Sequence, residues 1–392
     1  MNTMRHQLSS QRFLKGAVFS LYQLAKISQK LGSVSSSRSL HSVAHISSTY
    51  FSDYSQIGGG ERYVTSLAEA MANYVDTVLI SFGPTRKSLK QGKLRLEVYP
   101  ASGAVTNPTS YGFLQELINV DLVHCHQYRK SVTNLAIATS AALRKPVFVT
   151  DHGGGGSKIS DAIPLSKLLN GFLLVSDFSA KSLPSTKTSK VIYGGVSNKF
   201  IAEETYREKD KRILFVGRLL PHKGVNYLIE AIDENVQLDI VGRAYDEQYF
   251  ALLQELSKGK KVKFVTSAND SEIVETYQGA LVTILPSVYV DVNSNQHVAP
   301  ELLGLVLLES MACGTPVICT DVGGMPEIVE DGVTGFVVPP NDPTALRERI
   351  NWLVNNPEAA LQMGQRARER VIEKFTWDSV AKRCLEAYRQ SA

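Results

Sequence analysis

The chain has 392 residues, of which 43% are hydrophobic and 20% charged, and its formal net charge is +4. This length exceeds one ordinary hydrophobic core and predicts two or three domains. The composition is that of a soluble globular protein and excludes disordered, collagen-like and coiled-coil chains. Residues 1–52 hold six basic and no acidic residues, which leaves 36 basic and 38 acidic residues in the other 340. Because residues 53–392 are so close to neutral, the charge distribution gives no reason to expect a nucleic-acid partner.

Residues 13–31 predict an amphipathic helix within a basic leader that we place at residues 1–40. The residues near one helical face are apolar: Leu14, Ala17, Val18, Leu21, Leu24 and Leu31. A Ser-rich link, SVSSSRS, follows. The helix either packs on the first domain or makes a peripheral contact with a membrane surface. An acid-free, Ser-rich leader also suits an organellar transit peptide.

Four cysteines without metal or disulfide spacing indicate a reduced, cytoplasmic protein. No uncharged apolar run reaches the roughly 18 residues of a membrane span. A location in the cytoplasm, peripheral to the inner face of the membrane if the leader binds lipid, is therefore expected.

From residue 42 onward, short apolar runs alternate with helical stretches. The first series is SVAHIS, DTVLIS, LRLEVY, VDLVHC, PVFVT and GFLLVS, and the second is RILFVG, LDIVG, KVKFV, ALVTILP, PVICT and GFVVP. Strands that alternate with helices form parallel sheets covered on both faces. The chain is therefore expected to be α/β with two doubly wound domains, at 41–197 and 198–374. The boundary falls near 193–210, and the chain should end in helices at about 343–354, 357–373 and 376–390.

In such folds ligands bind beyond the carboxyl ends of the strands, so the loops there are the candidate sites. Gly58, Gly59 and Gly60 follow the first strand and precede a helix. Glycine lets a backbone approach a ligand, and the helix N-terminus favours an anion. A Gly-rich turn without a ligand is the alternative.

Two cations follow the strand RILFV. Arg218 comes directly after it, and Lys223 lies five residues later, at the start of a helix. Cations at a buried strand end are costly unless a negative group compensates them. A diphosphate accepts a bidentate Arg together with a Lys, so these two residues predict a diphosphate site; two solvated surface cations are the alternative.

Two carboxylates flank the start of an apolar helix. Glu301 precedes Gly304, and Glu309 follows eight residues after Glu301 among leucines. A carboxylate in such surroundings needs hydrogen-bond donors, which a ribose diol supplies. The helix N-terminus near Gly304 would direct amides at phosphate. A further Gly-rich turn, TDVGGMPE, follows the strand PVICT.

These motifs together resemble a known family. GGGERYVTSLAEA, DLVHCHQY, VGRLLPHKG, the pair Glu301 and Glu309, MACGTPVI, GGMPEIV and DGVTGFVVPPND are similar to the retaining glycosyltransferases of family 4. The match spans roughly residues 42–390. The resemblance implies the GT-B fold, with two Rossmann-like domains facing a cleft and C-terminal helices, here 375–392, that return to the N-terminal domain.

The resemblance also implies roles for individual residues. Arg218 and Lys223 would hold the donor diphosphate and stabilise the departing nucleoside diphosphate, without a metal or other cofactor. Glu301 would lie against the donor sugar, and Glu309 would bind the ribose diol. His126, the second histidine of HCH, would contact the sugar and acceptor and act in catalysis. The other implied positions are backbone sites, at Gly59, Gly60, Leu303, Gly304 and Leu305, and polar contacts, at His152 and Ser287.

The chain departs from the family pattern after Ser287. The segment VYVDVNSNQHVAP, 288–300, is several residues longer than the family usually has, and it lies where the donor sugar is expected. The usual Asn-Gly-Val is replaced by Gly194, Gly195 and Val196. The run from Gly153 to Gly156 does not indicate an acceptor.

The sequence therefore predicts a metal-independent glycosyltransferase that moves a sugar from a nucleoside-diphosphate sugar to an acceptor hydroxyl with retention. The acceptor would be a glycan, a lipid-linked compound or a small molecule. Three alternatives stay open: a GT-B epimerase or hydrolase of the nucleotide sugar, a non-catalytic nucleotide-binding scaffold, and a nicotinamide dehydrogenase. GGGGSK at 153–158 fits neither a G-x-G-x-x-G nor a P-loop motif, which disfavours the last.

Overall fold

The computed structural model describes residues 2–30, 39–50, 59–154, 156–184, 188–201 and 211–391. Leu31, most of the predicted Ser-rich link, Gly58, Gly155 and the segment 202–210 lie outside this range. The chain forms two compact units. The first consists of Met1–Val175, Ser182–Ile192 and Val380–Ala392, and the second of Ser176–Lys181 and Tyr193–Ser379.

The first unit is built on an eight-stranded sheet. Its order is β10 (Ser189–Val191), β9 (Gly171–Leu174), β8 (Val147–Thr150), β7 (Leu122–His126), β1 (Ser42–Tyr50), β2 (Asp76–Gly83), β4 (Leu94–Pro100) and β3 (Lys87–Gln91). All neighbours pair in parallel except β3 and β4. β5 (Ser102–Ala104) and β6 (Asn107–Thr109) form a separate antiparallel pair.

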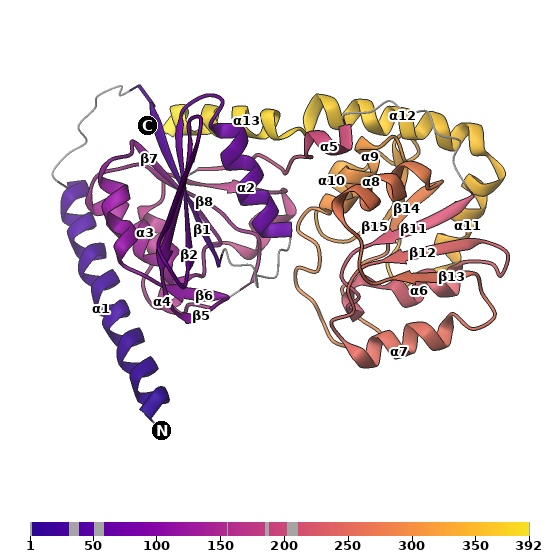
Figure 1. Cartoon of the computed structure of the whole chain (residues 1–392), viewed down its shortest axis with the longest axis horizontal. Helices are drawn as coiled ribbons and strands as arrows, with labels where there is room; N and C mark the ends of the chain where they lie inside the picture. Colours follow the sequence, from indigo (N-terminus) through magenta and orange to yellow (C-terminus); the bar gives the residue numbers. More distant parts are fainter. Residues whose placement is uncertain are drawn as a thin grey trace. The chain divides into compact units, whose positions relative to one another are not determined.

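Helices cover this sheet (Figure 1). They are α1 (Asn2–Lys30), α2 (Gly59–Met71), α3 (Ser131–Ala142), α4 (Ile159–Ala162), the 3₁₀ helices η1 (Gly112–Ile118) and η2 (Leu165–Leu168), and the C-terminal α13 (Trp377–Ser391). The short 3₁₀ helix η3 (Phe178–Ser182) belongs to the second unit except for Ser182. From Val380 onward α13 belongs to the first unit, although its first turn belongs to the second.

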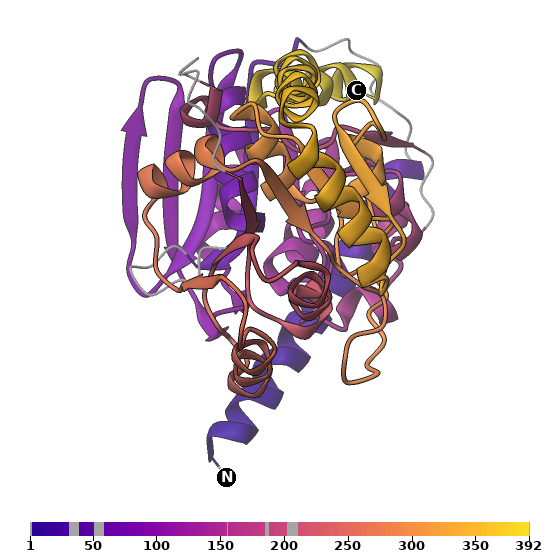
Figure 2. The same cartoon turned by 90° about the vertical axis from the view of Figure 1, so that its right-hand side faces the viewer.

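The predicted leader helix exists and packs on the first unit. Leu14, Val18, Tyr22 and Ala25, spaced three or four residues apart, are buried in its core. α1 lies along α3, and its N-terminal turns extend away from the rest of the unit (Figures 1 and 2). α3 is buried from Ser131 to Ala141, which a helix covering its outer side explains. Leu24, expected on the packed face, is instead exposed, because the contact is confined to a stripe centred about 115° around the helix from it.

The second unit is built on a six-stranded parallel sheet. Its order is β13 (Val262–Val265), β12 (Gln237–Val241), β11 (Arg212–Val216), β14 (Val282–Leu285), β15 (Val317–Thr320) and β16 (Gly335–Val338). The helices are α5 (Asn198–Ile201), η4 (Pro221–Lys223), α6 (Val225–Ala231), α7 (Glu247–Leu256), α8 (Asp270–Gly279), α9 (Leu305–Ala312), α10 (Met325–Ile328), α11 (Pro343–Asn355) and α12 (Pro357–Lys374). The central strands β14 and β15 are buried throughout, as strands covered on both faces require.

Local sequence signals fix several helix ends. Asn269 and Glu272 form a capping box at the start of α8. Asp342 caps α11, whose first residue is Pro343. The two predicted series of strands and the three predicted C-terminal helices are confirmed, and the chain consists of two Rossmann-like α/β domains. Among the described helices, none is both long enough and apolar enough to cross a bilayer.

Candidate functional site

Each sheet has one topological switch point, and the predicted site residues cluster there. In the first sheet the order reverses between β1 and β7, and in the second between β11 and β14. Adjacent loops leave the sheet in opposite directions at such a point and open a crevice at the carboxyl ends of the strands. His126 ends β7, and Arg218, Lys223 and Ser287 follow β11 or β14.

In the second unit, the loop after β11 is held against the end of β14. Gly224, between η4 and α6, has a φ of 67°, and a Cβ there would lie 2.0 Å from the carbonyl oxygen of Pro286. Only glycine combines this conformation with so close an approach. Lys223 is therefore fixed beside Ser287, although 64 residues separate them in sequence.

Lys223 and Glu301 form an ion pair, in which the ammonium contacts Oε1 of the carboxylate. Ser287 donates a hydrogen bond to the same Oε1 over 3.2 Å. Both charged side chains are 12% exposed, so the pair is largely withdrawn from water. The structure thus unites three of the predicted site residues in one cluster.

The backbone beside Glu301 is fixed by the predicted Gly-rich turn. Gly323 has a φ of 64°, and a Cβ there would lie 1.7 Å from the carbonyl oxygen of Glu301. The amide of Gly324 donates to that oxygen over 3.2 Å. The turn at 323–324 therefore has a structural role, which is to hold the Glu301 segment in place.

The helix α9 begins as predicted at the end of this segment. Leu303 is buried, Gly304 is the N-cap in a left-handed conformation, and Leu305 is the first helical residue. The first amides of a helix have no acceptor within it and attract an anion. These positions can therefore bind phosphate through the backbone.

Two other predicted residues differ from the Lys223–Glu301 pair in their surroundings. Glu309, on α9, accepts a hydrogen bond from the buried Tyr277 over 3.1 Å. Its carboxylate and that of Glu301 thus have different partners. Arg218 is exposed, and in the described part of the chain it forms no hydrogen bond or ion pair. It is available to a ligand from solvent.

The long segment 288–300 is an ordered loop closed by a carboxylate. Asp291 is 5% exposed and accepts hydrogen bonds from the amides of Asn293 and Asn295 and from Nε2 of His297. Burial opposes ionisation, but these hydrogen bonds hold the pKa of Asp291 below its usual value.

The same loop brings a histidine close to Lys223. The ring of His297 lies 5.0 Å from that of His222, the neighbour of Lys223. Burial and Lys223 lower the pKa of His222 to about 4. The loop therefore adds one imidazole, His297, beside His222 and Lys223 of η4, and sequence reasoning missed both histidines.

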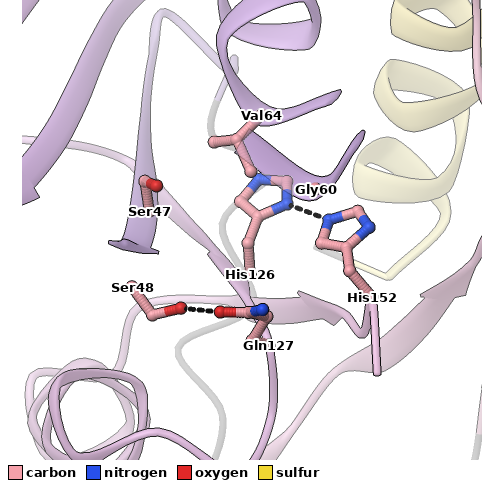
Figure 3. Close-up of a pocket in the computed structure, with 7 residues that line it drawn as sticks. All are labelled: Ser47, Ser48, Gly60, Val64, His126, Gln127 and His152. Atoms are coloured by element: carbon pink, nitrogen blue, oxygen red, sulfur yellow. Dashed lines mark hydrogen bonds between the residues drawn. The ribbon is translucent and has the colours of Figure 1, made fainter. Parts of the chain in front are cut away.

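In the first unit, a small hollow lies at the switch point. It is lined by Ser47 and Ser48 at the end of β1, Gly60 and Val64 of α2, His126 and Gln127 after β7, and His152 after β8 (Figure 3). Gly59 begins α2. His126 and His152 are hydrogen-bonded to each other, Nδ1 to Nε2, over 3.1 Å. A Cβ on Gly60 would lie 3.6 Å from Cβ of His152 and 3.9 Å from its Cγ, which are ordinary contacts.

Two further histidines, His45 on β1 and His124 on β7, lie next to His126. Nδ1 of His45 and Nε2 of His126 are 3.2 Å apart. Nε2 of His124 lies 2.8 Å from Oγ1 of Thr150, and its Nδ1 lies 2.7 Å from the hydroxyl of Tyr388 on α13. The alternation H-x-H in VHCHQ and a histidine in the neighbouring strand could have indicated this cluster, because alternate residues share one sheet face. Tyr388, 264 residues from His124, gives no local signal.

Burial keeps these imidazoles uncharged. It lowers the pKa of His45 and of His152 to about 3. It also holds the pKa values of His124 and His126 well below the usual range, with the neighbouring histidines adding to the effect.

One group of described residues has the composition of a metal site. His45, His124 and His126 each place a ring nitrogen within 4.8 Å of the others. The described residues add no carboxylate or thiolate to this set. Both ring nitrogens of His124 and of His126 already take part in hydrogen bonds.

Family models match most of the chain. The model described as "Glycosyl transferases group 1" matches residues 196–370, and that described as "Glycosyltransferase Family 4" matches residues 57–199. Together they span the two domains and all the predicted site residues.

Individual proteins agree with this match. An uncharacterised glycosyltransferase of Methanocaldococcus jannaschii is 29% identical over 306 residues, which are 69% of this chain and 75% of that protein. The alpha-maltose-1-phosphate synthase of Mycolicibacterium smegmatis is 37% identical over 194 residues, 45% of this chain and 47% of its own length. The fold is similar to that of the Anabaena protein HepE, solved with UDP and glucose, with a TM-score of 0.68, 20% identity, and coverage of 88% of this chain and 98% of that one.

Proposed function

This chain belongs to the family 4 glycosyltransferases of the GT-B fold, and from that premise we propose that it transfers a hexose from a nucleoside-diphosphate sugar to an acceptor hydroxyl with retention and without a metal. The observation that carries the proposal is the cluster of Lys223, Ser287 and Glu301 beside the N-terminus of α9. A diphosphate needs the cation and the amides, and a sugar needs the carboxylate and the hydroxyl.

Each group has a role in the proposed reaction. Lys223, Arg218 and the first amides of α9 stabilise the diphosphate as it leaves. Glu301 accepts hydrogen bonds from sugar hydroxyls and stabilises the positive charge that develops at the anomeric carbon. Glu309 binds the ribose diol, and Gly59 and Gly60 admit a phosphate to the start of α2. His126 and His152 contact the sugar or acceptor.

The proposed step is a front-face displacement. The bond from the anomeric carbon to the phosphate oxygen breaks while the acceptor oxygen bonds to the same face of that carbon. The hydroxyl proton passes to an oxygen of the leaving diphosphate, so the products are the glycoside and the protonated nucleoside diphosphate. The protein contributes position and electrostatic stabilisation.

A donor screen tests the proposal. We expect one of UDP-, GDP- or ADP-glucose to raise the melting temperature of the protein more than the other two do. The same donor should be consumed only when an acceptor is present. EDTA should leave turnover nearly unchanged. Donor breakdown without acceptor would favour the hydrolase alternative, binding without turnover the scaffold, and metal-reversible loss in EDTA would contradict the metal-free mechanism. HepE was solved with UDP and glucose, which makes UDP-glucose the first donor to try.

A cytoplasmic location with peripheral membrane contact through α1 also remains our proposal. Phe13, Leu24 and Ile27 are more than half exposed and lie on one side of the helix. The exposed cations Lys15, Lys26 and Lys30 would each add on the order of 1 kcal/mol at an anionic leaflet. Sedimentation with anionic liposomes at low salt should capture the protein, and the triple variant Phe13→Ser, Leu24→Ser, Ile27→Ser should stay in the supernatant. Failure of the wild type to sediment would end this part of the proposal.

A further inference from the structure

Three histidines of the first unit, His45, His126 and His152, form a chain of hydrogen bonds. Nδ1 of His45 bonds Nε2 of His126, and Nδ1 of His126 bonds Nε2 of His152. His45 is fully buried and His126 is 1% exposed, whereas His152 is partly exposed and lines the hollow at the switch point. The second nitrogen of His152 points away from His126 (Figure 3).

Only two proton arrangements satisfy this chain. A neutral imidazole carries one N–H, so His126 can donate one of its two hydrogen bonds and must accept the other. Either the hydrogen bonds run outward, from His45 through His126 to His152, or they run inward. The outward arrangement leaves Nε2 of His45 with a lone pair, and the inward arrangement leaves it with an N–H.

The surroundings of His45 decide between the two arrangements. Its Nε2 is buried and has no hydrogen-bond partner among the described residues. Both arrangements leave one buried ring nitrogen unpaired, but orphaned buried N–H groups are rarer in proteins than under-satisfied acceptors. The outward arrangement is therefore the more stable one, and it protonates Nδ1 of all three rings.

We propose that His45 is a positioning residue that fixes His126 and His152 as Nδ1–H tautomers, so that the site presents the Nδ1–H of His152 as a hydrogen-bond donor to an oxygen atom of the sugar or phosphate substrate. His126 then has no free ring nitrogen, and His152 makes the polar contact with the ligand. The identity of the ligand oxygen rests on the proposed glycosyltransfer, whereas the assignment of the tautomers is independent of it.

Nuclear magnetic resonance measures the tautomers directly. In full-length protein labelled with ¹⁵N-histidine at pH 7.5, ring nitrogens with and without hydrogen have well separated shifts. We expect Nδ1–H for His45, His126 and His152. An Nε2–H signal from His126 or His152 would overturn the proposal, as would movement of the His45, His124 and His126 signals together on adding Zn²⁺, since that would indicate a metal site.

Two variants separate positioning from a structural role. His45→Leu removes the inner donor, so His126 and His152 should shift towards a mixture of tautomers, whereas His45→Asn retains an N–H near the Nδ1 position and should restore the wild-type pattern. His124→Asn is the matched control, because His124 bonds Thr150 and Tyr388 and lies outside the chain. Unchanged signals in His45→Leu, or equal changes in His124→Asn, would contradict the proposal. The wild-type spectrum decides the tautomers even if a variant fails to fold, and it needs no turnover.

Discussion

Lys223 and Glu301, the residues proposed to bind the two ends of the donor's scissile linkage, neutralise each other in an ion pair. Their mutual attraction offsets part of the desolvation cost of placing a cation and a carboxylate where both are nearly buried. In the proposed reaction, a diphosphate that approaches Lys223 competes with Glu301 for the ammonium. Donor binding would then weaken the ion pair and make Glu301 available to the sugar.

Glu301→Gln should separate these two effects. The amide cannot form an ion pair, so the nucleoside diphosphate should bind several-fold more tightly, because it no longer competes with a carboxylate for the largely buried ammonium of Lys223. Turnover should fall strongly. Calorimetry and initial rates measure the two quantities, and Glu348→Gln, at an exposed residue of α11, is the control. Weaker or unchanged nucleotide binding would show that the ion pair does not oppose the ligand.

Gly224→Ala should damage both stability and donor binding. The new methyl group would lie 2.0 Å from the carbonyl oxygen of Pro286 and would force the Lys223 loop away from β14. Gly259→Ala is the matched control, because its φ of 79° is similarly strained for alanine but its Cβ would meet no atom within 4 Å. We expect the control to lose about 1 kcal/mol in the free energy of unfolding and Gly224→Ala to lose clearly more. Equal losses in denaturant titrations would mean that the close approach to β14 is unimportant.

Leu14→Ala should destabilise the first unit by about 2–5 kcal/mol, since Leu14 is 1% exposed in its core. Leu24→Ala, the same substitution on the exposed side of the same helix, should change the free energy of unfolding by no more than about 0.5 kcal/mol. Melting temperatures and urea titrations compare the two. If Leu14→Ala were neutral, α1 would not be an integral part of the fold.

Acid should destabilise the protein through its buried histidines. The pKa of His45 is about 3 in the folded chain and about 6.5 when unfolded, so between these values the unfolded chain binds more protons and the free energy of unfolding falls as the pH falls. His45 alone should account for about 2 kcal/mol between pH 7.5 and 5.0. Urea titrations at these two pH values should show a smaller loss for His45→Asn than for the wild type. An identical loss would indicate that His45 is not held neutral.

Much of the architecture could be predicted from periodicity. Apolar runs such as PVICT and GFVVP are too short for helices, and Gly or Pro bounds them, so most strands of the two sheets had a local signal of their own. Polar edge strands were missed: β3, KSLKQ, is exposed throughout and has no apolar pattern. The N-terminal helix was predicted, but its packing against α3 depends on a partner more than 100 residues away.

The site was predictable where chemistry lies in a local motif. Arg218, Lys223, Glu301 and Gly304 stand at strand or helix ends that the pattern itself marks. The ion pair between Lys223 and Glu301 was not predictable, because it depends on how two loops meet. The same holds for His45 and Tyr388, whose contacts join strands and a helix from opposite ends of the chain. Long-range contacts of this kind cannot be inferred from the spacing of residues along the sequence.

The anomeric configuration of the product tests the central claim most directly. The enzyme would be incubated with an α-linked nucleoside-diphosphate glucose and an acceptor, and the one-bond and vicinal couplings of the product's anomeric proton would be read by NMR. We predict an α-linked product formed with one equivalent of nucleoside diphosphate, at a rate that Lys223→Ala lowers at least tenfold, because a charge-assisted contact contributes about 1.5–3 kcal/mol. The surface variant Lys258→Ala should match the wild type. A β-linked product, or full activity in Lys223→Ala, would contradict the account.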